Sequence, residues 1–141
     1  MNDLESLQKY FSLAELVNPD LIRRYGSQCW TFIPKEAITM LLKVRRRWNS
    51  YLLVNYQDLK NCGLRKPNSP HSYMSAHKQG MAFDLHSNDN PRLYSMIKEH
   101  HKELGVFQLE NREATNINDN DKKSGWVHCS CRGFEFRVIN P

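Results

Sequence analysis

The chain has 141 residues, of which 40% are hydrophobic and 25% are charged, and its formal net charge is +5. This length and composition fit one ordinary globular domain that spans residues 1–141 and has its own core. No apolar run reaches the roughly 20 residues that cross a bilayer, so we expect no membrane insertion. The N-terminal residues lack the basic and apolar stretches of a secretory signal, which predicts synthesis in the cytoplasm without export.

The first part of the chain is predicted to be mainly helical. Residues 4–10 have the spacing of a short amphipathic helix, and Ser12-Leu13-Ala14-Glu15 has the form of a capping box that starts another. Pro34 suits the first position of a helix that runs to about Trp48, because its apolar residues recur at helical spacing. Residues 51–54 then predict a buried strand.

The second part is predicted to contain most of a small sheet. Residues 55–79 form a long polar loop with several prolines, and loops of this length in small domains are usually functional. After a strand at 81–86, a helix is expected from Asn90 to about Leu104, where Gly105 ends it. Further strands are expected at 106–110, 126–131 and 134–139. This order predicts an α+β domain in which N-terminal helices pack on a mostly antiparallel sheet.

The strand at 81–86 carries the first candidate functional residue. Side chains alternate between the two faces of a strand, so Ala82, Asp84 and His86 share one face. The residues between them are apolar and must face the core, which predicts that Asp84 points into a cleft on the other side. Gly80 permits a tight turn that would let His77 fold back beside Asp84. His86 would either orient Asp84 or lie exposed at the strand end.

The same alternation applies to residues 126–131. His128 falls on the polar face, whereas Cys129 and Cys131 are predicted to face the core. His77, Asp84 and His128 would then form a His₂Asp set, and three protein ligands plus one water are typical of a catalytic zinc site. The spacing alone also fits a loop histidine, an ion-paired aspartate and a strand histidine without a metal.

Several segments together resemble a known family of zinc enzymes. The segment Ser75–Asp84 reads Ser-x-His-x-x-Gly-x-Ala-x-Asp, and residues 126–128 read Trp-Val-His. This pattern resembles the metal motif of the zinc D-alanyl-D-alanine carboxypeptidase and L-alanyl-D-glutamate endopeptidase family. Shorter similarities to small bacteriophage members of that family occur at residues 11–17, 63–65, 109–110 and 137–141.

The resemblance implies a fold of the Hedgehog and lysostaphin type. It implies a Zn²⁺ cofactor held by His77, Asp84 and His128, and hydrolysis of an amide bond in peptidoglycan peptides. The protein would be an endolysin-like enzyme encoded by a phage or prophage. It would act on the cell wall after release from the cytoplasm or as a virion component.

The general base is not where many family members have it. They carry a carboxylate three residues before the second histidine or an aspartate two residues after it, and here those positions hold Gly125 and Ser130. Glu110 is the candidate that we prefer, because it matches a glutamate of the phage-type pattern. Asp119 and Asp121 are the alternatives, because they lie closer to His128 in the sequence.

Two further roles follow from the same resemblance. Arg65 would neutralise a substrate carboxylate or the oxyanion formed during attack, a task that suits a planar and permanently charged guanidinium. Ser75 would bind the substrate or simply shape the turn before His77.

Two other functions compete with the peptidase. The absence of carboxylates at Gly125 and Ser130 allows a catalytically inactive zinc-binding module that binds the cell wall or a protein partner. The basic charge suggests a nucleic-acid-binding protein. However, the chain has no recognised nucleic-acid motif and no stripe of interleaved basic and aromatic residues, so we predict no nucleic-acid partner.

Overall fold

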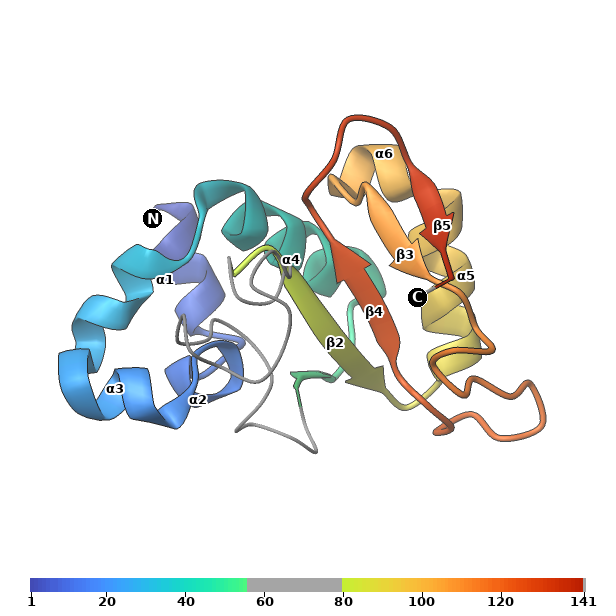
Figure 1. Cartoon of the computed structure of the whole chain (residues 1–141), viewed down its shortest axis with the longest axis horizontal. Helices are drawn as coiled ribbons and strands as arrows, with labels where there is room; N and C mark the ends of the chain where they lie inside the picture. The colour runs from blue at the N-terminus through green and yellow to red at the C-terminus, as the bar shows by residue number, and fades with distance from the viewer. Residues whose placement is uncertain (56–79, 141) are drawn as a thin grey trace.

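The computed structural model describes residues 1–55 and 80–140. Its N-terminal part is helical, as expected, and comprises α1 (Asp3–Gln8), α2 (Leu13–Leu16), α3 (Pro19–Tyr25), the 3₁₀ helix η1 (Gly26–Phe32) and α4 (Lys35–Trp48) (Figure 1). The predicted capping box is present at α2, where the Glu15 carboxylate accepts the backbone N–H of Ser12 at 2.8 Å. None of the described helices is long and apolar enough to span a bilayer.

Helix α4 provides the main helical contribution to the core. Its inner face carries buried residues at helical spacing, including Ile38, Leu41 and Trp48. The helix ends at Asn49, which adopts a left-handed conformation (φ 52°) and donates its N–H to the carbonyl of Arg45 at 3.0 Å. The predicted helix is therefore confirmed, although Pro34 precedes its first turn as the N-cap.

A five-stranded mixed sheet forms the second part of the domain, which confirms the predicted α+β class. The strands are β1 (Leu52–Val54), β2 (Ala82–Ser87), β3 (Gln108–Glu110), β4 (Val127–Ser130) and β5 (Arg137–Ile139), in the spatial order β1-β2-β4-β3-β5. Neighbouring strands are antiparallel except for β3 and β5. The parallel pair arises because the chain reverses after β4 and returns along the outer edge of β3.

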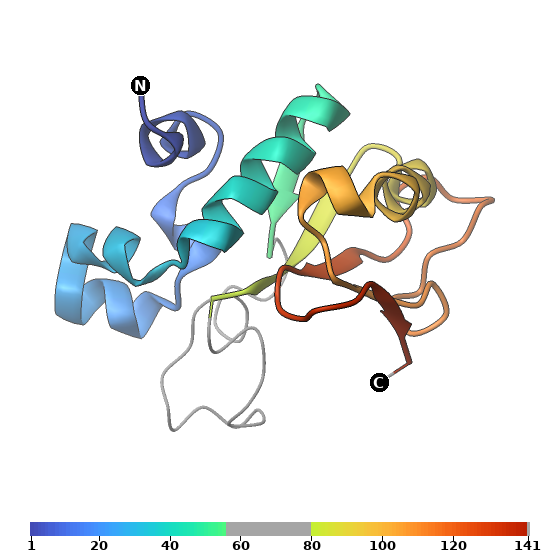
Figure 2. The same cartoon turned by 90° about the horizontal axis from the view of Figure 1, so that it is seen from above.

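Helices cover one face of this sheet. Helix α5 (Asn90–Glu99) and the short α6 (His101–Leu104) lie with α4 on the same side of the strands (Figure 2). The prediction of one continuous helix to Leu104 is wrong, because the backbone at His100 leaves the helical region between α5 and α6. Gly105 ends α6 as expected, in the left-handed region with φ 75°.

The core lies between these helices and the sheet. The strands contribute side chains that are completely buried, namely Phe83, Leu85, Leu109, Val127 and Cys129. Burial of a large apolar side chain stabilises a fold by about 1.5–3 kcal/mol relative to its exposed state. The apolar face of the sheet is therefore fixed, and this fixes which side chains lie on the opposite face.

Candidate functional site

Three polar residues from three strands form a row across the sheet. Asp84 on β2 is paired directly with His128 on β4. On the other side of β4, Leu109 is paired with Cys129, so the same register places Glu110 opposite His128. Paired residues lie on the same face of a sheet. The predicted orientation of Asp84 and His128 away from the core is confirmed by the full burial of their strand neighbours.

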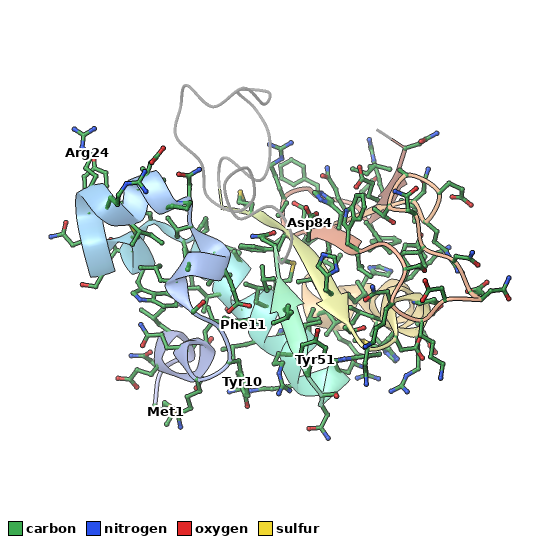
Figure 3. All side chains as sticks on the ribbon, turned by 90° about the horizontal axis from the view of Figure 1, so that it is seen from below. Met1, Tyr10, Phe11, Arg24, Tyr51 and Asp84 are labelled. Atoms are coloured by element: carbon green, nitrogen blue, oxygen red, sulfur yellow. The ribbon has the colours of Figure 1, made fainter. Side chains whose placement is uncertain are left out.

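Asp84 and His128 are in direct contact. The His128 Nδ1 lies 2.9 Å from Asp84 Oδ1, and the two side chains are only 14% and 19% exposed, respectively. Figure 3 locates Asp84 near the middle of the sheet, between the N-terminal helices and the C-terminal loops. The row is thus partly shielded from water. Electrostatic interactions in such partly buried surroundings are stronger than at a free surface.

The Asp84–His128 pair fits the chemistry of a zinc site. Imidazole nitrogen and carboxylate oxygen are both common zinc ligands. The pair therefore supplies donor types that zinc accepts, and the contact at 2.9 Å shows that the two side chains are neighbours. Within residues 1–55 and 80–140, no group of three His, Cys, Asp or Glu side chains is arranged to hold a metal. The predicted third ligand, His77, lies outside those residues.

The carboxyl group of Glu110, the third residue of the row, has a raised pKa. Burial raises the pKa of its carboxyl group, nearby His128 lowers it, and the Asp84 carboxylate raises it further, with burial the largest effect. The interaction with both neighbours shows that sheet pairing brings the preferred base beside the two predicted ligands. A raised pKa makes a carboxylate a stronger base, which suits a group that accepts and returns a proton.

The alternative bases lie outside this row. Asp119 is exposed and forms an ion pair with Arg112. Asp121 is also exposed, and its carboxylate accepts the backbone N–H of Lys123 at 3.1 Å. Both belong to the segment 111–125, where these contacts shape the turns of the loop. Of the three candidates, Glu110 is therefore the one that lies beside Asp84 and His128.

His86 lies two residues from Asp84 on the same strand. It is half-buried rather than exposed. Burial lowers the pKa of His86, and the Asp84 carboxylate raises it by a smaller amount. The sequence left open whether this histidine belongs to the site, and its burial and its interaction with Asp84 place it at the edge of the row.

The sequence did not single out Asn55, which holds the backbone at Asp84. The completely buried Asn55 accepts the N–H of Asp84 through Oδ1 at 3.1 Å and donates its own N–H to the Asp84 carbonyl at 2.7 Å. Its Nδ2 donates to the carbonyl of Glu15 at 2.8 Å. Asn55 has φ 56°, a conformation that asparagine tolerates better than most residues. An asparagine directly after a buried strand is the sequence signal for such a role.

The structure explains why Gly125 and Ser130 carry no carboxylate. Gly125 has φ 62°, and a Cβ at this position would lie 2.1 Å from the carbonyl oxygen of Thr115. No side chain fits there without movement of the backbone. Ser130 is completely buried, and its Oγ accepts the N–H of Arg132 at 3.0 Å. A carboxylate at Ser130 would lose its hydration inside the protein, which is costly.

The remaining predicted site residues, Arg65, Ser75 and His77, lie outside the described residues, as does the predicted loop that contains them except for its first residue, Asn55. Cys129 and Cys131 are buried on the core side of β4, as predicted. Comparison of the chain with protein-family models, curated proteins and solved structures gave no match.

Proposed function

We propose that this protein is a zinc-dependent peptidase that hydrolyses an amide bond in peptidoglycan peptides. The observation that supports this most is the contact of Asp84 with His128 at 2.9 Å, beside a glutamate whose pKa is raised. The resemblance of the Ser75–Asp84 and Trp126–His128 segments to the D-alanyl-D-alanine peptidase family suggests the reaction. On this proposal the α+β domain has the fold of that family, which is shared with the Hedgehog signalling domain.

The metal site would consist of His77, Asp84 and His128. When bound, zinc in such a site lowers the pKa of a water molecule and polarises the substrate carbonyl. The hydrogen bonds from Asn55 fix the backbone of Asp84, so that its carboxylate stays oriented toward His128. Ligands held by supporting hydrogen bonds generally bind their metal more tightly.

Glu110 would act as the general base and then as the general acid. Its carboxylate accepts a proton from the attacking water and returns that proton to the leaving amine. Partial burial raises the pKa of this carboxyl group, which makes its carboxylate a stronger base toward the attacking water. Arg65 would stabilise the negative charge that develops on the carbonyl oxygen, and Ser75 would contact the substrate.

The proposed place of action is the bacterial cell wall. The protein would reach it after release from the cytoplasm or as part of a phage particle. The formal net charge of +5 suits an anionic envelope, because opposite charge raises the local concentration of the enzyme at its substrate.

Zinc content and cell-wall digestion test the proposal together. We expect about one equivalent of zinc per chain by elemental analysis, and release of new amino groups from purified peptidoglycan. His128→Ala should lose both properties. His101→Ala is the matched control, because its ring stacks on Phe136 at 3.8 Å, away from the row. Zinc binding without product from wild-type protein would instead support the inactive binding module.

A further inference from the structure

A pocket extends the polar face of the sheet beyond the row of Asp84, His128 and Glu110. It has a volume of about 430 Å³, and its lining includes His86 from β2 and Trp126 at the start of β4. These two residues lie two positions along their strands from Asp84 and His128, on the same face. The pocket is therefore a continuation of the candidate site.

The lining of this pocket suits an anion attached to an apolar group. Lys123 and Asn116 contribute an ammonium and an amide from the segment 111–125, and Tyr51 and Trp126 contribute aromatic rings. Within the described part of the chain, no Asp or Glu lines the pocket. Lys123 is exposed and forms no ion pair with residues 1–55 or 80–140. Its positive charge is thus available to a ligand.

The wall that carries Lys123 is held in place by the buried Asn90. The Nδ2 of Asn90 donates to the carbonyls of Ser124 and Gly125, both at 3.1 Å, and its Oδ1 accepts the N–H of Ser87 at 2.8 Å. The Asn90 N–H donates to the carbonyl of Lys122 at 2.6 Å. The segment before β4 is therefore tied to the end of β2 and the start of α5, so the pocket exists before a ligand arrives.

The distance from the pocket to the row of Asp84, His128 and Glu110 indicates where a bound substrate residue would lie relative to the bond that is cleaved. Two residues along a strand cover about 6.7 Å, and an extended peptide covers that distance in about two residues. We propose that the pocket binds the carboxylate of an acidic substrate residue about two positions from the scissile amide bond. Lys123 pairs with the carboxylate, and Trp126 and Tyr51 contact its aliphatic part. This inference rests on the proposed peptidase function and adds a substrate preference to it.

Matched peptides test the preference. Blocked peptides carry one Glu either two positions before or two positions after an alanyl–alanine bond, and their twins carry Gln instead. We expect zinc-loaded wild-type protein to prefer Glu at one of the two positions by about two- to fivefold in kcat/KM, the range of a partly exposed ion pair. The preference should shrink as the salt concentration rises.

Two lysine variants distinguish binding in the pocket from a general effect of positive charge on the protein surface. Lys123→Gln should abolish the preference for Glu, and Lys122→Gln should keep it, because Lys122 does not line the pocket. Cleavage without any preference for Glu, or a preference that persists in Lys123→Gln, would overturn the pocket assignment and leave the peptidase function standing.

A binding measurement keeps the two proposals distinct. In ¹⁵N NMR spectra, the Trp126 indole signal should shift on addition of at least one of the two Glu peptides and shift less with its Gln twin. Lys123→Gln should remove this difference. If no peptide is cleaved but the shift follows this pattern, the binding of the carboxylate by the pocket stands, whereas the peptidase function and the stated distance to a scissile bond fail. If the Glu and Gln peptides give equal shifts in wild-type protein, the pocket assignment fails.

Discussion

A single asparagine side chain connects the candidate site to the N-terminal helices. Asn55 bonds to both backbone groups of Asp84 and also to the carbonyl of Glu15 in α2. Asn55 is completely buried and its side-chain bonds are part-buried, and a buried polar group that loses its partner costs about 1–3 kcal/mol. The position of Asp84 thus depends on a residue that supplies no ligand atom.

Substitution of Asn55 should therefore destabilise the protein and weaken metal binding. Asn55→Ala removes the side-chain bonds and places an alanine at φ 56°, so we expect a loss of about 2–4 kcal/mol in the free energy of unfolding. Asn55→Gly relieves the backbone strain and should lose less. Urea unfolding measures both variants, and a chelator titration measures zinc affinity. An Asn55→Ala protein as stable as wild type would show that these bonds contribute little.

The role of Glu110 has an equally direct test. Glu110→Gln preserves the shape of the side chain and removes its ability to accept a proton. It should keep the zinc and the fold but lower the rate by roughly 10²–10⁴, the usual contribution of a general acid–base group. Asp119→Asn and Asp121→Asn are the controls, and both should retain most activity. If the activity of either aspartate variant collapses while Glu110→Gln remains active, the base belongs to the loop.

At the scale of elements, the alternation of side chains along β4 places a polar histidine on one face of the sheet and a buried cysteine on the other. His128 lies on the polar face, whereas Cys129 lies among core residues and is completely buried. Cys131, just after the strand, donates its thiol to the carbonyl of Met81 at 3.4 Å. Burial raises the pKa of both thiols, so the folded protein keeps them protonated and poorly reactive.

This protonation predicts a change of stability with pH. In the folded protein burial raises the pKa of Cys131 from 9.0 to about 11. As the pH rises from 9 toward 11, the unfolded chain loses the thiol proton before the folded protein does, so the free energy of unfolding falls. Denaturant unfolding under reducing conditions should show a steeper fall for wild type than for Cys131→Ala. Parallel pH profiles would contradict the raised pKa.

At the scale of the whole molecule, the proposed zinc joins parts of the chain that are distant in sequence. His77 and Asp84 belong to one segment, whereas His128 lies 44 residues after Asp84, and the unfolded chain does not hold the two parts together. A ligand that binds only the folded state stabilises it by about 2.7 kcal/mol when its free concentration is a hundred times the dissociation constant. The metal should therefore stabilise the domain as a unit.

Thermal unfolding measures this effect directly. Wild-type protein should unfold at a higher temperature with zinc than with EDTA. His128→Ala should show the same midpoint in both conditions, and His101→Ala should behave like wild type. Equal midpoints for wild-type protein with zinc and with EDTA, over a range of zinc concentrations, would argue against a zinc site in the folded state.

Local patterns in the sequence were sufficient to predict α4, the capping box of α2, and the alternation that orients Asp84 and His128. These features depend on residues close together in the chain, so their periodicity is visible in the sequence. Pairing between distant segments determines the other features, namely the strand order, the place of Glu110 beside His128, and the bonds from Asn55 to Asp84. Tertiary structure decided them, because the register of a sheet is selected by the burial of all its strands at once.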